Sequence, residues 1–156
     1  MELKDSGERR EFETGAVRDI CENKGRCDLL PLDVAYLVTG DEVLCYINDY
    51  IRKGDIDDIV SVIQMFSINE FISAYDALLY VAKQYEDGAK KYSERNWEKG
   101  IPVHCYVDSG VRHYLKFKRG DDDEPHDRAF LWNMYGLIWT HIHKPELIDL
   151  PFAEKE

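Results

Sequence analysis

The sequence has no apolar run that approaches the ~20 residues needed to span a bilayer. Its first residues, MELKDSGERREFE, are charged and include no apolar segment of the kind found in secretory signals. These two absences predict a cytoplasmic protein without a membrane partner.

Paired cysteines are also missing. The four cysteines, Cys21, Cys27, Cys45 and Cys105, are scattered and form no Cys-x-x-Cys pair. In a cytoplasmic chain this spacing is typical of reduced thiols rather than of a disulfide framework or a structural zinc site.

The chain has no excess of positive charge, because 31 acidic residues oppose 20 lysines and arginines and leave a net charge of −11. Proteins that bind phosphate backbones use basic stripes, so this charge argues against a nucleic-acid partner. Locally, however, residues 9–26 carry five basic side chains, including Arg18, Lys24 and Arg26. Such a segment can bind one small polyphosphate ligand, although an ordinary solvated tail explains it equally well.

Alternating strands and internal repeats are scarce as well, which favours an all-α fold. Hydrophobic residues make up 44% of the 156-residue chain, enough for one domain with its own core. We expect a small antiparallel helical bundle with an irregular N-terminal segment over residues 1–31. The apolar periodicity predicts helices over residues 32–50 with a break near Gly40, 56–66, from Asn69 or Ser73 to Ala89, 108–118 and 126–143.

Residues 85–100, YEDGAKKYSERNWEKG, combine an acid, several cations and a tryptophan. The helical spacing predicts that Glu86 lies on the buried stripe that includes Ala77 and Leu78. A buried carboxylate needs a cation, a metal or a hydrogen-bond donor to offset its desolvation. The segment therefore indicates a polyanionic, aromatic ligand such as a nucleotide, with Trp97 either stacked on the base or filling the core.

Other polar side chains occupy apolar helix faces. His113 lies between apolar neighbours, and His126 and Asn133 are two helical turns apart on one face. A lone inward histidine is usually a hydrogen-bonded core residue. Two histidines together with Glu86 and Asn133 favour a pocket between packed helices.

An acidic loop precedes the last predicted helix. Asp122, Asp123 and Glu124 either complement the helix dipole or supply oxygen ligands to Mg²⁺, and the sequence favours neither role over the other. Asp108 and Arg112 have the spacing of an ordinary helix ion pair, while Arg112 is also a candidate phosphate ligand.

Six segments occur in the order seen in the dATP/dGTP diphosphohydrolase-like domain family: TGAVRD, KGRCDLLP, YEDGAKKY, RNWEKG, DSGVRHYLKF and HDRAFLWN. The chain resembles this family, which is common in phages and prophage-bearing bacteria and includes the phage enzymes of the MazZ type. The resemblance covers residues 13–31 and about 78–140, so that residues 32–77 look like a helical insertion in a single domain over residues 1–156. The family is similar in kind to the MazG-like all-α nucleotide pyrophosphohydrolases, in which acidic helix positions hold Mg²⁺ over a triphosphate.

The resemblance implies hydrolysis of a purine deoxynucleoside triphosphate, dATP or dGTP, to the monophosphate and pyrophosphate, in the host cytoplasm for a phage protein. Mg²⁺ is the expected cofactor, with Mn²⁺ as an alternative. We expect Glu86, His113 and His126 to be catalytic and Glu86, Asp123 and Glu124 to hold the metal. The expected substrate-binding residues are Arg18, Lys24, Arg26, Lys90, Lys91, Arg95, Asn96, Trp97, Arg112 and Asn133.

The paired acids of the MazG-like pattern are not evident, because Glu86 is followed by Ala89 at i+3. This departure leaves a second interpretation open: the protein binds a nucleotide or a nucleotide signal without hydrolysing it. Phage sponge proteins act in this way when they sequester the signal nucleotides of a host defence system. Small bundles of this kind often form homo-oligomers, and two chains can complete one pocket.

Overall fold

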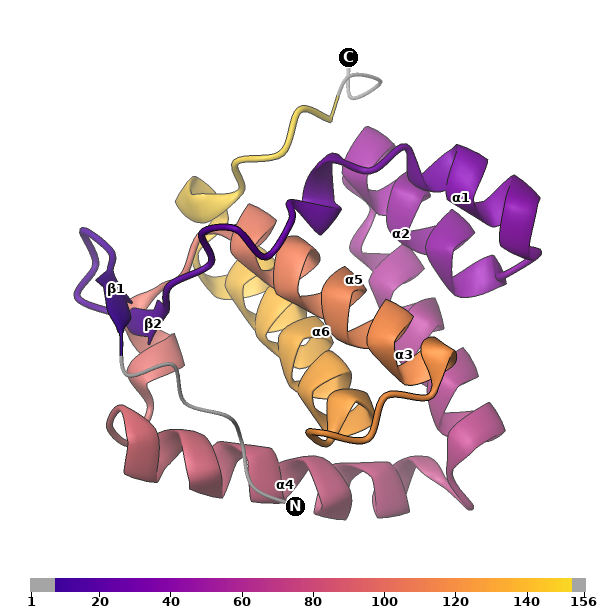
Figure 1. Cartoon of the computed structure of the whole chain (residues 1–156). Helices are drawn as coiled ribbons and strands as arrows, with labels where there is room; N and C mark the ends of the chain where they lie inside the picture. The colour runs from indigo at the N-terminus through magenta and orange to yellow at the C-terminus, as the bar shows by residue number, and fades with distance from the viewer. Residues whose placement is uncertain (1–7, 153–156) are drawn as a thin grey trace.

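The computed structural model describes residues 8–152, which fold mainly into helices and confirm the all-α prediction (Figure 1). A two-stranded antiparallel sheet, β1 (Arg9–Glu11) and β2 (Val17–Asp19), comes first. The α-helices are α1 (Leu32–Thr39), α2 (Glu42–Lys53), α3 (Ile56–Glu70), α4 (Ala74–Lys91), α5 (Val103–Arg119) and α6 (His126–His143). The 3-10 helices are η1 (Cys27–Leu29), η2 (Asn96–Lys99) and η3 (Pro145–Leu147).

Local sequence signals set the ends of several helices. The side chains of Asp41, Asp55 and Ser73 precede α2, α3 and α4, and each accepts a hydrogen bond from a backbone N–H in the first turn. Gly40 and Gly54 end α1 and α2 with φ of 70° and 75°, a left-handed conformation that favours glycine. The predicted break at Gly40 and the start of the long helix at Ser73 are confirmed.

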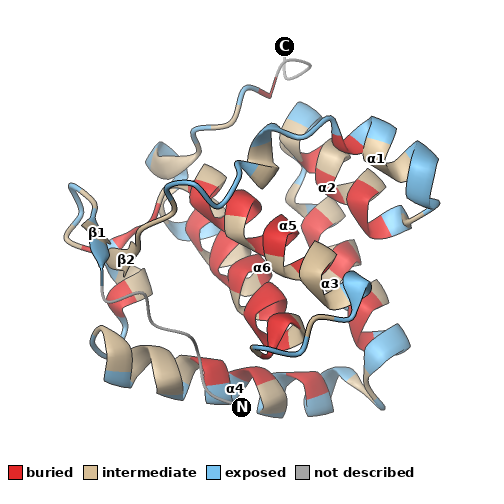
Figure 2. Cartoon of the chain, in the orientation of Figure 1, coloured by how far each residue is buried: buried red, intermediate tan, exposed pale blue. Residues whose placement is uncertain are grey.

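The antiparallel pair α5 and α6 forms the centre of the molecule, and both helices are largely buried (Figure 2). A glycine allows the two helices to approach closely. A Cβ atom added to Gly136 in α6 would overlap the ring of Tyr106 in α5, which is itself fully buried. Close packing of these two helices therefore requires a residue without a side chain at this point.

Helices α1–α3 occupy most of residues 32–77, the range expected to be a helical insertion. They contribute Ile47, Tyr50, Ile59 and Phe66 to the same apolar cluster that contains α5 and α6. The rings of Phe66 and Phe130 lie 5.0 Å apart, centroid to centroid, at 64°. Residues 32–77 thus share one core with the rest of the chain, while their status as an insertion relative to shorter relatives stays a prediction.

Helix α4 turns a different face to the core from the one we expected. Its buried residues are Ala77, Val81 and Gln84. Leu79 is 76% exposed, and Glu86 lies on the exposed side as well. The expected buried position of Glu86 is therefore wrong.

Polar contacts with α6 explain this orientation of α4. Arg128, 4% exposed, donates from Nε to Gln84 Oε1 and from Nη2 to Asp87 Oδ2, each at 2.9 Å. One turn away, the Tyr80 hydroxyl donates to Asp127 Oδ1 at 3.0 Å. Because the Arg128 guanidinium needs these partners, the face of α4 that carries them turns inward.

Two local elements differ from the predictions. The strands β1 and β2 form a hairpin, with Arg10 opposite Arg18, inside a segment expected to be irregular. Helix α5 begins at Val103, five residues before the predicted start at Asp108. Its first turn is buried on most sides, so it lacks the polar face that an amphipathic pattern requires.

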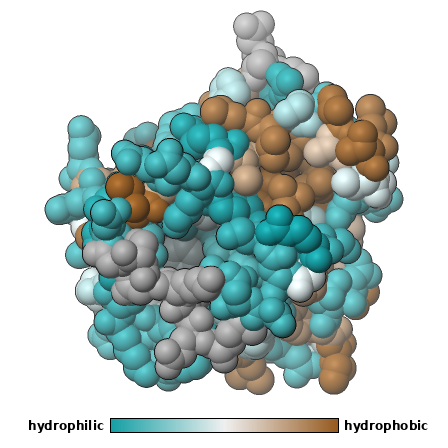
Figure 3. Space-filling view, viewed as in Figure 1, coloured by the Kyte–Doolittle hydropathy of each residue, from teal (hydrophilic) through white to brown (hydrophobic). Residues whose placement is uncertain are grey.

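The surface carries apolar side chains over the region of α1 and α2 (Figure 3). Leu37 and Val38 of α1 are each 78% exposed. Within residues 8–152, none of the helices combines the length and the apolar composition that crossing a bilayer requires.

Candidate functional site

A cavity of about 450 Å³ lies between the β-hairpin, the second half of α4, η2 and the helix pair α5–α6. These elements lie far apart in the sequence but enclose one space. Its polar and aromatic lining includes Arg18, Asp19, Lys24, Gln84, Tyr85, Lys91, Tyr92, Arg95, Asn96, Trp97, Ser109, Arg112, His113, Lys116, Asp123, Glu124, Trp132 and Asn133.

The hairpin is held over the cavity by side chains from α4 and η2. Asn96, 5% exposed, accepts from Val17 N–H at 2.8 Å and donates to Val17 O at 2.7 Å. Lys91 Nζ lies 2.6 Å from Asp19 Oδ2, and the Tyr92 hydroxyl donates to Asp19 Oδ1 at 3.1 Å. Asn96 uses its amide to position β2, so its amide oxygen and nitrogen are both engaged by the backbone.

A buried ion pair fixes the chain that follows the hairpin. Arg112 Nη2 lies 2.6 Å from Asp108 Oδ1 and donates to Gly25 O at 2.5 Å. Asp108 Oδ1 also accepts from Cys27 N–H at 2.7 Å. The pair is therefore more than an ion pair within one helix, because it also fixes residues 25–27 against α5.

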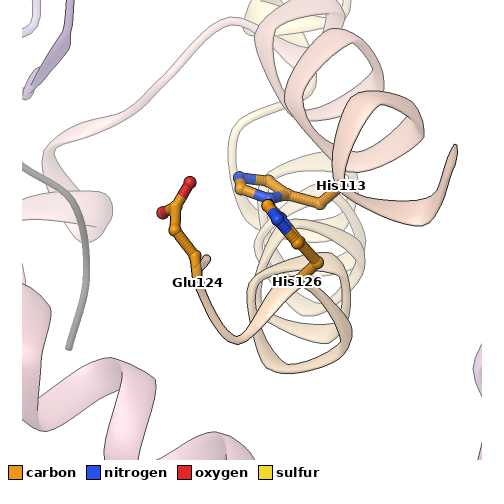
Figure 4. Close-up of side chains that lie close together, drawn as sticks. All are labelled: His113, Glu124 and His126. Atoms are coloured by element: carbon orange, nitrogen blue, oxygen red, sulfur yellow. The ribbon is translucent and has the colours of Figure 1, made fainter. Parts of the chain in front are cut away.

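Two histidines face each other at one end of the cavity (Figure 4). The Nδ1 atoms of His113 and His126 are 2.9 Å apart, and His126 Nε2 lies 2.7 Å from Asp123 Oδ1. Burial, followed by the charge of His126, lowers the pKa of His113 to about 3, so its ring is neutral near pH 7. When both rings are neutral, His126 donates to Asp123 and accepts from His113, which leaves the His113 Nε2 lone pair free.

Carboxylates next to this pair complete two groups that can hold a cation. The ligand atoms of His113, Glu124 and His126 all lie within 4.8 Å of one another. The same holds for Asp121, Asp123 and His126. Imidazole and carboxylate together suit Mn²⁺ and related first-row ions, whereas Mg²⁺ prefers an all-oxygen shell. The donor set thus fits a divalent cation.

The cavity lining is basic although the protein as a whole is acidic. Lys91 pairs with Asp19, and Arg95 pairs with Glu98 at 3.1 Å. Lys24 and Lys116 also line the cavity and form no ion pair within the part of the chain that the structure describes. Two uncompensated ammonium groups in the same cavity lining favour a polyanionic ligand.

Aromatic rings form another part of the cavity lining. Tyr85 makes an edge contact with Trp97 at 5.8 Å and a tilted contact with Trp132 at 5.9 Å, centroid to centroid. Burial raises the pKa of Tyr85, so this phenol stays neutral. A wall of this kind can pack against a flat heteroaromatic ring.

The comparison with protein-family models found one match. Residues 64–150, more than half of the chain, match the model of the dATP/dGTP diphosphohydrolase N-terminal domain. The chain belongs to this family. Neither the comparison with curated proteins nor that with solved structures found a match.

The family match covers α4, η2, α5 and α6, and with them both histidines and the acidic loop. The β-hairpin, with Arg18, lies outside the matched residues. The family name denotes a nucleotide hydrolase, and the cavity contains groups that can hold a metal.

Four of the predicted site residues do not line this cavity: Glu86, Lys90, Arg26 and His126. Glu86 Oε2 lies 2.6 Å from Lys83 Nζ and 3.8 Å from Lys90 Nζ, on the outer face of α4. Hydrogen bonding to Lys83 lowers the pKa of Glu86. Arg26 forms an exposed ion pair with Asp28 and borders a second cavity of about 90 Å³. The expected convergence of Glu86, Lys90 and Arg26 on the site is therefore wrong, because each has a partner elsewhere.

The other predicted residues do meet at the cavity. His126 is 2% exposed and does not itself line the cavity, but it contacts His113, which does. Asn133 lines the cavity two turns further along α6 than His126.

Several lining residues were missed. Lys116 follows His113 by three residues, so the helical period alone would have found it. Tyr85 opens the segment 85–100, but neither it nor Trp132 was among the predicted site residues. Asp19 gave no signal, because its role depends on Lys91 and Tyr92, more than 70 residues away.

Proposed function

We propose that the protein hydrolyses a purine deoxynucleoside triphosphate, dATP or dGTP, to the monophosphate and pyrophosphate in this cavity. The observation that carries the proposal is the polarity of the site. Its lining combines His113 next to His126, two carboxylates and unpaired lysines with an aromatic wall. A purine nucleoside triphosphate with a bound cation combines the matching groups. The family match supports the reaction class.

Lys24 and Lys116 bind the triphosphate in this proposal. Lys116 lies one turn beyond His113 on the same face of α5. Lys24 precedes Gly25, whose carbonyl group accepts from Arg112. Both ammonium groups line the cavity, where they offset phosphate charge that grows on the leaving pyrophosphate.

In this proposal His113, His126 and Glu124 would hold a divalent cation in place of the hydrogen bond between the two histidines, and Asp123 would orient His126 by accepting from its Nε2. Such an ion would neutralise charge on phosphate oxygens and activate water. Two cations are candidates: Mg²⁺ commonly accompanies a nucleoside triphosphate, whereas Mn²⁺ tolerates imidazole ligands better.

Residues of the protein also position the attacking water molecule and accept its proton. Water attacks the α-phosphorus, the bond between the α-phosphorus and the bridging oxygen breaks, and pyrophosphate leaves. A carboxylate of the acidic loop, Asp123 or Glu124, takes the proton of the attacking water. The aromatic wall keeps the nucleoside in place during this step.

The proposal is tested by incubating purified protein with each of the four deoxynucleoside triphosphates and either Mg²⁺ or Mn²⁺. Chromatography and a pyrophosphate assay identify the products. We expect equal amounts of monophosphate and pyrophosphate from purine nucleotides, and no product with EDTA. Release of inorganic phosphate alone, or no turnover of any nucleotide, would exclude the proposed reaction.

A nucleotide-binding protein without hydrolytic activity is the second candidate. The unpaired Lys24 and Lys116 favour it, because they attract a polyanion without a metal. Calorimetry with a purine deoxynucleotide in EDTA separates the two. A binding protein keeps its affinity in EDTA and never releases pyrophosphate when metal is restored, whereas the proposed enzyme releases it.

A further inference from the structure

Arg18 in β2 has a guanidinium group that is only partly satisfied. Its Nη2 donates to Asn133 Oδ1 at 3.1 Å. Its Nη1 is shielded from water and has no hydrogen-bond partner within residues 8–152. Arg18 lines the main cavity, so this unused donor belongs to the wall of a space that can hold a ligand.

Neighbouring groups fix the orientation of this guanidinium. Its central carbon lies 5.5 Å from the ring centroid of Tyr106 and 5.4 Å from that of Trp132. Asn133, 2% exposed, donates through Nδ2 to Ala129 O at 2.8 Å and so presents Oδ1 to Arg18. A donor held on three sides loses little conformational freedom when a ligand binds, which favours recognition of one particular acceptor.

The position of Arg18 matches the nucleobase better than the phosphates. Asn133 follows His126 by seven residues, which in a helix corresponds to about 10.5 Å. Arg18 contacts Trp132 of the aromatic wall, and its charge also helps to lower the pKa of His113. A nucleotide whose base packs against Trp132 therefore places that base beside Arg18.

The two purines differ at the edge that a guanidinium reads. Guanine presents two acceptors, N7 and O6, whereas adenine presents one acceptor, N7, and the donor N6. N7 accepts a hydrogen bond in both purines, but an N–H donor aimed at position 6 bonds to O6 of guanine and meets the N6 donor of adenine. A buried donor left without an acceptor is costly.

We infer that Arg18 is a specificity-determining residue that contacts O6 and N7 of the purine and selects guanine over adenine. The inference rests on the proposed function, since it takes the cavity to hold a purine nucleotide. It names dGTP as the preferred substrate.

The test compares dGTP, dITP and dATP with wild-type protein and with Arg18→Met, which keeps an unbranched side chain but removes every donor. dITP retains O6 and N7 and lacks only the 2-amino group. We expect wild-type kcat/KM for dGTP and dITP to exceed that for dATP by about tenfold or more. Arg18→Met should remove most of this difference by lowering the values for dGTP and dITP alone.

Arg52→Met is the matched control, because Arg52 lies on the exposed side of α2 and does not line the cavity. It should leave all three values unchanged. If circular dichroism shows that Arg18→Met does not fold, Arg18→Lys replaces it. Lysine keeps the positive charge but lacks the planar guanidinium, so the preference for dGTP and dITP over dATP should fall in this variant as well.

Calorimetry with dGMP and dAMP in EDTA measures the same preference without turnover. Tighter binding of dGMP, lost in the Arg18 variant, supports the inference even if no triphosphate is hydrolysed, in which case only the proposed reaction fails. Equal loss of affinity for both monophosphates would show a phosphate contact and overturn the inference. Equal binding of both by wild-type protein would overturn it as well.

Discussion

At the scale of single residues, the contact between Asp123 and His126 determines how the proposed metal site is ordered. Asp123→Ala removes the acceptor 2.7 Å from His126 Nε2. Outer carboxylates of this kind orient a ligating imidazole, so we expect Mn²⁺ affinity to fall by roughly 10- to 100-fold. Calorimetric titration with Mn²⁺ measures the change.

The neighbouring Asp122 provides the matched control. Asp122 is exposed and belongs to neither candidate metal group, so Asp122→Ala should keep the wild-type affinity. Equal effects of the two substitutions would mean that only the overall charge of the loop matters.

A second residue-scale prediction concerns His104, whose ring Nδ1 pairs with Asp149 Oδ2. Hydrogen bonding to Asp149, and next to Cys105, raises the pKa of His104 from 6.5 to about 10. A raised folded pKa stabilises the protein fully below pH 6.5, and this contribution is lost as the pH rises towards 10. Because both side chains are partly exposed, we expect a loss of only about 1 kcal/mol.

Urea unfolding at pH 6.0 and pH 10 measures this loss. In His104→Gln the free energy of unfolding should fall by about 1 kcal/mol less over the same pH change, since glutamine does not titrate. A pH dependence identical to that of wild-type protein would show that the pair contributes nothing.

Part of the site could be predicted from the sequence, because polar side chains on apolar helix faces are unusual. His113 and Asn133 stood out as polar groups on apolar faces, and the structure brings both to the cavity. Glu86 was misplaced because helical periodicity does not reveal which face of α4 meets its neighbour. That choice depends on Arg128, which needs Gln84 and Asp87 as partners.

At the scale of elements, the contact between α5 and α6 depends on Gly136. Gly136→Ala places a methyl group against the Tyr106 ring, which is fully buried and has little room to move. Overpacking of a core typically costs about 1–3 kcal/mol, and we expect the free energy of unfolding to fall by this amount. Denaturant unfolding measures it.

Gly88 in α4 is the control, since a Cβ atom there would meet nothing within 4 Å. Gly88→Ala should raise the free energy of unfolding by up to roughly 1 kcal/mol, because alanine favours the helix. A Gly136→Ala protein as stable as wild type would mean that the two helices separate without cost.

Helix positions were predictable because their signals are local. Caps such as Ser73 and the glycine after α1 lie within a few residues of the ends they set. The β-hairpin was missed because its support is not local: Asn96 holds Val17 from 79 residues away. No pattern inside residues 8–20 contains that information.

At the scale of the whole molecule, the cavity is built from two parts of the chain. The family-matched residues supply the histidines, the acidic loop and most of the aromatic wall, and the N-terminal hairpin supplies Arg18. The net charge of −11 and the basic cavity are compatible, because the acidic residues lie mainly elsewhere. This distribution favours one small anion inside the protein over a polyanion along its surface.

The most direct measurement of the central claim is pyrophosphate release from dGTP by wild-type protein, Glu124→Gln and Glu86→Gln. Each substitution removes one negative charge, but Glu124 lines the cavity beside the histidines and Glu86 lies on the outer face of α4. We expect Glu124→Gln to lose at least about 100-fold in kcat, the range typical of a lost acid–base group, and Glu86→Gln to match wild type. Loss of activity in Glu86→Gln with retention in Glu124→Gln would contradict the assignment of this cavity as the active site.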